Sequence, residues 1–295
     1  MDNKDYRIIQ IPDTPQYIIN QIKTEIESRL DRCGLFYRLF ARSKKGQAVE
    51  EKIAKKGYTT DGKKLQDLIG VRIVLYFKDD INLCESIILR DYDVLEVVRD
   101  QEEADSFKPT RLNIVCKLSQ DIVNLFDSAI WEYPIDQTFE IQIRTIFSEG
   151  WHEVEHDLRY KNHVEWKGHD DLSRSLNGIY ATLETCDWAI IHLFQSKAYM
   201  HYKHKEWEAM LRNQLRIRFE SKPLDSSIIA ILDFKPETAK NLFRVDRQLL
   251  LKNLSNIRFP LPLTMNNVVY AINELFLKDE ELSKITPEYF MKWLK

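Results

Sequence analysis

Residues 136–161 constrain the fold most strongly, because the spacing of their apolar side chains changes once. Over residues 140–144 apolar and polar residues alternate, which predicts a β-strand with two isoleucines on one face. The apolar residues then recur at helical spacing, so we predict a helix capped by Thr145 that runs to about Tyr160. The polar face of the strand carries Glu140, Gln142 and Arg144. Such a face is typical of a functional strand, and also of the solvated side of an ordinary antiparallel strand.

The predicted helix contains His152-Glu-Val-Glu-His156, a spacing that places two imidazoles on one helical face, as in zinc proteases. The extended form of that motif needs a third ligand at a fixed offset, and the next histidine, His163, falls one position too late. The helix is also strongly charged, whereas a zinc-binding helix is usually more apolar. A zinc hydrolase is therefore the weaker interpretation of this segment.

The complete stretch supports a different interpretation. Glu-Ile-Gln-Ile-Arg-Thr, then Trp-x-x-x-x-His and Tyr-Lys, resembles the final motif of the RelA/SpoT-type (p)ppGpp synthetase domain. The residues in register are Glu140, Gln142, Arg144, Thr145, Trp151, Glu155, His156, Tyr160 and Lys161. In that family the strand glutamate helps to hold magnesium and the following helix closes the site. The resemblance implies a catalytic and metal-binding role for Glu140, and acceptor-binding roles for Gln142, Arg144 and His156.

The composition limits where a nucleotide could bind. The net charge of the 295-residue chain is −3, so the whole molecule is not a general polyanion binder, and a nucleotide site must be a local basic patch. Only eight residues are glycine, which favours a helix-rich α/β or α+β protein. The four cysteines form no C-x-x-C pair, and no apolar run approaches ~18 residues. We therefore expect a cytoplasmic protein with reduced thiols and no membrane segment.

The most basic region is residues 36–64, and such a run is often only a solvated face. Here Arg42-Ser-Lys44, followed by Lys52, resembles the family segment Arg-x-Lys-x-x-x-Ser-x-x-x-Lys, whose basic residues hold the donor triphosphate. Ala48 stands where the family has serine. Arginine offers forked donors to phosphate and lysine a point charge, which suits ATP. The resemblance implies that Arg42, Lys44 and Lys52 bind ATP.

Residues 67–72, Asp-Leu-Ile-Gly-Val-Arg, lead into a strand predicted over residues 71–77. An aspartate before a strand is usually a turn residue or a helix cap. This segment, however, looks like the family's Asp-x-x-Gly-x-Arg, whose aspartate is a magnesium ligand. The resemblance implies that Asp67 and Glu140 together hold Mg²⁺, and that Arg72 reaches a phosphate or braces Asp67. Two carboxylates suit magnesium, which takes its other ligands from water and phosphate.

The chain departs from the family before the third predicted strand. Synthetases carry Gly-Tyr-x-Ser-x-His there, and the tyrosine stacks on the guanine of the acceptor. Residues 107–116 read Phe-Lys-Pro-Thr-Arg-Leu-Asn-Ile-Val-Cys, so within this segment only Arg111 and Asn113 remain as candidate acceptor ligands. Losing one stacking contact typically costs ~1–3 kcal/mol. The donor half of the site therefore matches the family better than the acceptor half.

The remaining periodicities predict a mixed sheet flanked by helices. Further helices are expected over 14–33, 81–89, 121–126, 171–197 and 199–219, further strands over 92–98 and 112–118, and short helices over 228–232, 246–254, 267–276 and 287–294. Thr14 would cap the first helix, with Pro15 at its first position. The fold class is thus α/β (α+β), nucleotidyltransferase-like, with a helical C-terminal extension. We expect a synthetase domain over residues 1–198 and a helical accessory domain over residues 199–295.

The resemblance implies a magnesium-dependent transfer of the β,γ-pyrophosphoryl group from ATP to a ribose 3′-hydroxyl. Three hypotheses stay open. The acceptor is GDP or GTP, giving an alarmone, or it is the 3′ end of tRNA, as in toxic relatives. The basic and aromatic residues of 199–219 favour the second. In the third, the domain binds a nucleotide or a partner without turnover. A homo-oligomer or a neutralising antitoxin is a possible partner.

Overall fold

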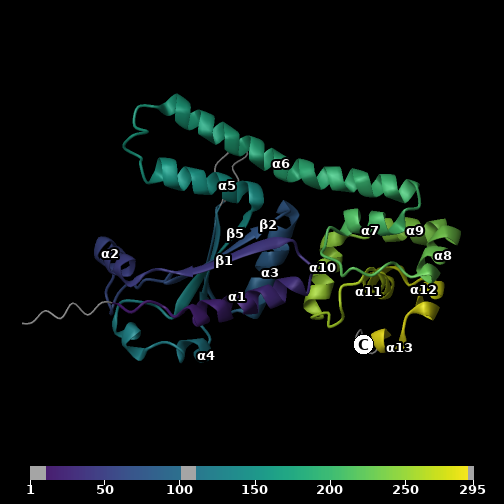
Figure 1. The fold of residues 1–295 in the computed structure, drawn as a ribbon, viewed down its shortest axis with the longest axis horizontal. Coiled ribbons are helices and arrows are strands. Elements are labelled where there is room, and N and C mark those ends of the chain that lie inside the picture. The colour runs from purple at the N-terminus through teal and green to yellow at the C-terminus, as the bar shows by residue number, and fades with distance from the viewer. Residues whose placement is uncertain (1–10, 101–110, 292–295) are drawn as a thin grey trace, which may run out of the picture.

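The structure of the protein, a computed structural model, describes residues 11–100 and 111–291. These residues form one five-stranded sheet and a set of helices (Figure 1). The strands are β1 (Tyr37–Ser43), β2 (Ile69–Leu75), β3 (Val94–Arg99), β4 (Leu112–Lys117) and β5 (Thr138–Thr145). The helices of the first half are α1 (Gln16–Asp31), α2 (Gly46–Lys56), α3 (Ile81–Asp91), α4 (Gln120–Val123) and α5 (Ile146–Glu155). The later helices are α6 (Asp170–Lys203), α7 (Trp207–Leu215), α8 (Ser226–Phe234), α9 (Pro236–Phe243), α10 (Arg247–Asn256), α11 (Met265–Ile272), α12 (Glu280–Ile285) and α13 (Glu288–Met291).

The sheet is mixed, as the sequence predicts. Its strand order is β1-β2-β5-β4-β3, with β2 and β5 parallel and the other neighbours antiparallel. The α/β class with a helical C-terminal region is therefore confirmed. The parallel pair lies at the centre, and its register places Gly70 opposite Glu140.

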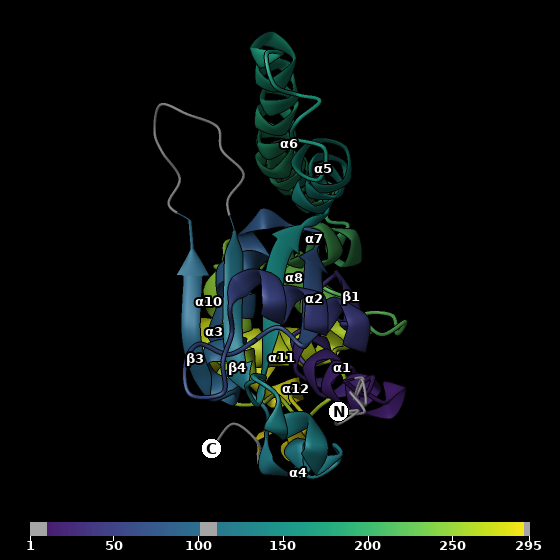
Figure 2. The same ribbon diagram turned by 90° about the vertical axis from the view of Figure 1, so that its left-hand side faces the viewer.

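The two faces of the sheet differ sharply. Alternate residues of the central strands, including Val71, Ile73, Ile141 and Ile143, are buried. Helix α1 contacts β1 and helix α3 contacts β5, so these helices cover the apolar face. The other alternate positions carry polar side chains, as the sequence analysis predicts for β5. Helices α5 and α6 extend beyond one end of the sheet, whereas α4 lies at the other end (Figure 2).

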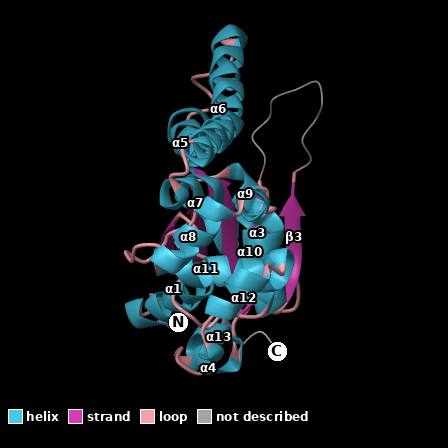
Figure 3. Cartoon of the chain, turned by 90° about the vertical axis from the view of Figure 1, so that its right-hand side faces the viewer, coloured by secondary structure: helices cyan, strands magenta, loops and turns pink. Residues whose placement is uncertain are grey.

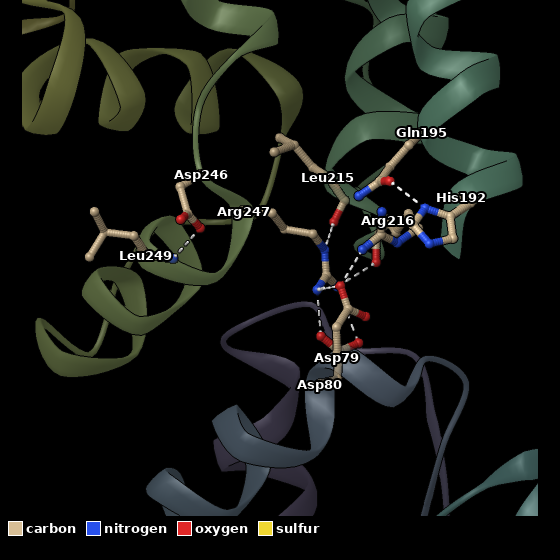
Figure 4. A network of polar contacts seen from close by, with 9 residues as sticks. All are labelled: Asp79, Asp80, His192, Gln195, Leu215, Arg216, Asp246, Arg247 and Leu249. Carbon is tan, nitrogen blue, oxygen red and sulfur yellow. Dashed lines mark hydrogen bonds and ion pairs between the residues drawn. The ribbon is translucent and has the colours of Figure 1, made fainter. Parts of the chain in front are cut away.

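The C-terminal helices pack beside the sheet through a buried charge network (Figures 3 and 4). The guanidinium of Arg247 donates to both carboxylate oxygens of Asp80, at 2.6 and 3.1 Å, and to the carbonyls of Leu215 and Arg216, at 2.5 and 3.2 Å. Arg216 donates to Asp79 at 2.5 Å and has a left-handed backbone, with φ of 44°. Because a buried charge is costly without partners, this network specifies how the C-terminal helices sit on the short helical turn Lys78–Asp80.

Several sequence-based expectations are wrong in detail. The predicted helix over 199–219 does not exist as one unit, because α6 continues to Lys203 and α7 is separate. Lys205 and Arg216 have positive φ, which a continuous helix does not allow. Thr14 does not cap α1: Pro15 precedes the helix, and the buried Thr14 hydroxyl has no hydrogen-bond partner among the described residues.

Three elements were not expected from the sequence: β1, α9 and α12. The acidic segment and much of the divergent acceptor loop lie at 101–110, outside the described residues. Helix α6 passes through the predicted boundary between residues 198 and 199, so the division into two domains stays a prediction. Among the helices that the structure describes, none is long and apolar enough to cross a membrane.

Candidate functional site

Strand register assembles the polar face of the sheet into rows, because paired residues point to the same side. In the first row Arg42 pairs with Gly70, and Gly70 with Glu140. A Cβ atom added to Gly70 would meet no atom within 4 Å, so the space between Arg42 and Glu140 is open. In the second row Arg72 pairs with Gln142, and Gln142 with Asn113. Residues predicted from four separate sequence segments therefore share one face.

Asp67 lies at the edge of this face with two lysines. Its Oδ2 atom accepts hydrogen bonds from Nζ of Lys44 at 2.9 Å and from Nζ of Lys52 at 2.6 Å. Burial acts to raise the pKa of Asp67, but the hydrogen bonds and charges of Lys52 and Lys44 outweigh it and hold the pKa below its usual range. The carbonyl of Gln66 accepts from the Thr138 hydroxyl at 2.9 Å, which places Asp67 beside the start of β5.

The carboxylate of Glu140 is held by two amides. Asn113 Nδ2 donates to Oε1 at 2.7 Å, and Gln142 Nε2 donates to Oε2 at 3.3 Å. Both partners are neutral, so they orient the carboxylate without neutralising its charge. The structure thus brings Asn113, Gln142 and Glu140 together, and brings Lys44, Lys52 and Asp67 together.

Two acidic residues of α5 form ion pairs with arginines of the polar face. Glu149 accepts from Arg72 at 2.5 Å and from Arg144 at 2.9 Å, and Glu153 also accepts from Arg72. Burial lowers the pKa of Arg144, and the nearby guanidinium of Arg72 acts in the same direction, while Glu149 opposes both. The sequence analysis missed Glu149 and Glu153. Their spacing of four residues on one helical face was the available signal.

Helix α5 is fixed at its start by Thr145. The hydroxyl oxygen of Thr145 accepts from the backbone N–H of Ser148 at 3.1 Å, which confirms the predicted cap. The same hydroxyl donates to Oδ2 of Asp187 in α6 at 2.7 Å. Burial raises the pKa of Asp187 to about 6, although the Thr145 hydrogen bond acts against this shift. The cap therefore joins β5, α5 and α6 at one point.

Three predicted site residues stand apart from these clusters. Arg42 is exposed on the polar face, with no ion pair among the described residues. Arg111 is exposed and pairs with Asp100 at 2.9 Å. His156 is exposed, contacts Asp157 at 2.9 Å and stacks on Tyr160, and neither of these partners belongs to the polar face. The structure leaves the acceptor-binding roles of Arg111 and His156 as predictions.

The two histidines of the His-Glu-x-x-His sequence have different surroundings. His152 is buried beside Trp151 and Tyr180, with ring centroids 5.5 and 6.4 Å away, whereas His156 is exposed. Within residues 11–100 and 111–291, no group of three or more His, Cys, Asp or Glu side chains could hold a metal ion. The described residues therefore provide no third ligand for a zinc site here.

The residues present do fit a magnesium ion bound together with a phosphate ligand. Asp67 and Glu140 supply two carboxylates from neighbouring segments, and a lowered pKa keeps Asp67 ionised. Magnesium typically takes one or two protein carboxylates and completes its shell with water and phosphate oxygens. Two carboxylates would therefore suffice, with the remaining positions left to the substrate and water.

Comparisons with known proteins agree with the motifs. Residues 41–165 match a family model described as "Region found in RelA / SpoT proteins". This part of the chain is a domain of the RelA/SpoT type, as its motifs predict. A search of curated proteins found no match.

Solved structures similar to the chain include three bacterial proteins. Small alarmone synthetase 1 from Bacillus subtilis is 18% identical over 60% of this chain and 91% of its own, with a TM-score of 0.45. Small alarmone synthetase 2 from the same organism is 19% identical over 60% and 92%, with a TM-score of 0.44. A GTP pyrophosphokinase family protein from Streptococcus pneumoniae is 21% identical over 59% and 85%, with a TM-score of 0.42.

Proposed function

We propose that the protein transfers the β,γ-pyrophosphoryl group of ATP to a ribose 3′-hydroxyl in a magnesium-dependent reaction. The observation that supports this most directly is the convergence of Lys44 and Lys52 on Asp67, at the edge of the face that carries Glu140. Two cations and two carboxylates suit a triphosphate bound with a divalent cation. The RelA/SpoT-type domain over residues 41–165 contains all four residues.

The donor triphosphate would lie against Lys44, Lys52 and Arg42. ATP carries about four negative charges, and phosphoryl transfer depends mainly on positioning and on stabilising charge at the transferred group. In the structure both lysines are bonded to Asp67, so they lie beside one of the two carboxylates that we propose as metal ligands. Bound magnesium, held by Asp67 and Glu140, would neutralise charge on the phosphate oxygens.

The chemical step forms one bond and breaks one. The acceptor 3′-oxygen bonds to the β-phosphorus of ATP, the bond from that phosphorus to the oxygen bridging to the α-phosphate breaks, and AMP leaves with that oxygen. The hydroxyl proton passes to a base, for which we propose Glu140. Its hydrogen-bond partners, the side-chain amides of Asn113 and Gln142, orient the carboxylate but are themselves uncharged.

The first candidate acceptor is a guanine nucleotide, which would make the product an alarmone. Asn113 and Gln142 lie beside Glu140 on the polar face, and Arg144 lies one row further along β5. These side chains provide amide and guanidinium donors for a nucleotide.

The second candidate acceptor is the 3′ end of tRNA, which the absence of tyrosine from the acceptor loop favours. The basic helical region does not add to this argument, since its Trp207 and Arg216 are buried.

A transfer assay tests the proposal. Purified protein with γ-³²P-ATP and magnesium is offered GDP, GTP, ATP and bulk tRNA in parallel. We expect label on GDP or GTP; label on tRNA would select the second acceptor. Lys44→Met should abolish transfer, whereas Lys45→Met, at the exposed neighbouring position, should not. Glu140→Gln should bind ATP without transferring label. Absence of label from every acceptor, with ATP still bound, would favour a domain that binds nucleotide without turnover.

A further inference from the structure

Helix α6 presents apolar side chains on two faces. Its inner face carries Tyr180, Asp187, Ile191 and Ala198, which are buried, and the helix packs against α5 at one part of its length and against α7 and α9 at another. The helix lies along the edge of the molecule, so its outer face is not covered in the same way (Figure 1). Large apolar residues are exposed on that outer face, which indicates an interaction surface.

The outer face of α6 follows a strict seven-residue repeat. The first position of the repeat carries Leu172, Ile179, Cys186, Leu193 and Met200. The second position, three residues later, carries Ser175, Thr182, Ala189 and Ser196. Eight of these nine residues are exposed, Cys186 is partly buried, and none of the nine is charged. We call these nine residues the outer seam.

The length and the period of the outer seam fit a partner helix. From Leu172 to Met200 the seam spans about 42 Å. A straight helix drifts by about 20° in each heptad, so a seven-residue repeat kept over this length is typical of a helix that winds around another helix. The next longest helix in the described part of the chain, α1, has 16 residues and buries its apolar face in the core. Within the described residues, the helix that matches α6 is therefore α6 of a second copy.

The two positions of the outer seam differ in side-chain size, which determines the orientation of the pair. In a parallel pair each position faces its own equivalent, so the layers of the second position would hold only serine, threonine or alanine and would leave gaps. In an antiparallel pair the first position of one helix faces the second position of the other, so each large side chain packs against a small one. Helix interfaces pack densely when large and small residues alternate across facing positions. The outer seam is therefore complementary to itself in the antiparallel orientation.

We propose that a second copy of the chain docks on the outer seam, in an antiparallel pair of α6 helices related by a twofold axis near Cys186. A twofold axis uses the same surface on both copies, as this self-complementary pattern requires. The pair removes apolar surface from water at Leu172, Ile179, Leu193 and Met200, which are each between 53% and 60% exposed in the single chain. The proposal does not depend on the transfer reaction.

The mass of the purified protein tests the pairing. Light scattering of the protein at micromolar concentration should give twice the mass of one chain. Combining Ile179→Glu with Leu193→Glu places charges in the seam, so the dissociation constant of the dimer should rise by about a hundredfold or more. Phe234→Glu is the matched control, because Phe234 is apolar and 87% exposed but lies on α8. Thermal unfolding of each variant shows whether the single chain is still folded.

Two results of that experiment would overturn the proposal. A parent protein with the mass of one chain would show that a different protein covers the outer seam, or that nothing does. A dimer that persists when both Ile179 and Leu193 are glutamate would show that the copies meet through another surface.

Crosslinking tests the orientation of the two helices. Among the four cysteines, Cys186 is partly buried and the other three are buried, so a short bis-maleimide should react at Cys186 and join the two copies across the axis. Moving the cysteine to the end of the seam, in a variant with Cys186→Ala and Leu172→Cys, should abolish the crosslink, because an antiparallel pair separates its two equivalent ends by roughly 35–45 Å. A crosslink that persists in this variant would indicate parallel helices and would contradict the proposed arrangement.

Discussion

Arg247 spans both carboxylate oxygens of Asp80, at 2.6 and 3.1 Å, and both side chains are almost inaccessible to solvent. The pair joins α10 to the turn that begins α3. Removing one partner of a buried ion pair leaves the other charge unpaired, which typically costs ~3–5 kcal/mol. We expect Arg247→Leu to lower the free energy of unfolding by about that amount in urea denaturation. The exposed Arg244→Leu should change it by less than ~0.5 kcal/mol. Equal effects would show that the network does not stabilise the fold.

We predict that Glu153 competes with phosphate for Arg72, because it bonds the guanidinium that the sequence motif predicts to bind ATP. It is exposed and bonds Arg72 from α5, while Glu149 holds Arg72 and Arg144 from a more buried position. Exposed ion pairs are worth ~0.2–1 kcal/mol, so Glu153→Gln should tighten ATP binding by about two- to fivefold in titration calorimetry. The increase in ATP affinity should be smaller at high ionic strength. Glu165→Gln, also exposed, is the matched control; weaker binding by Glu153→Gln would contradict the competition.

Asp187 should make stability depend on pH. Burial raises its folded-state pKa to about 6, above the usual value of ~3.9 for the unfolded chain. The folded state therefore binds the proton more tightly, and this contribution to stability is fully present below pH ~3.9 and is lost as pH rises through 6. Asp187→Asn should thus be more stable than the parent by about 3 kcal/mol at pH 7, with the difference shrinking toward pH 4. A difference that is constant between pH 4 and pH 7 would rule out this titration.

Metal content separates the magnesium proposal from the zinc interpretation. Mass spectrometry of the purified protein should find no stoichiometric zinc, and EDTA should leave the melting temperature unchanged. The same chelator should stop pyrophosphoryl transfer, and added magnesium should restore it. Stoichiometric zinc that is lost together with His152 and His156 would overturn our assignment of this helix.

The strongest sequence patterns predicted the centre of the fold. The change of period after Thr145 correctly predicted β5, its cap and α5, because both periodicities and the cap are local properties. Strand β1 was missed for a physical reason. Its outward positions, Arg38 and Arg42, suggested only a basic patch, although Tyr37 and Leu39 alternate with them and are buried.

The candidate site was predicted less completely than the fold. The sequence motifs predicted Asp67, Lys44 and Lys52 as site residues, and the structure joins these three side chains by hydrogen bonds. The roles of these residues in binding and catalysis stay predictions. The spacing of Glu149 and Glu153 could have shown that they share one helical face, but not that they bind Arg72, because they lie more than 70 residues away and meet it only once α5 crosses the end of the sheet.

Helix α6 has a mechanical consequence. Its 34 residues span about 51 Å and contact α5 at one part of their length, and α7 and α9 at another. An unbroken helix does not bend sharply unless backbone hydrogen bonds break, so it behaves as a stiff lever. A shift of α5 would therefore displace the far end of α6 and tilt the surface against which α7 and α9 pack.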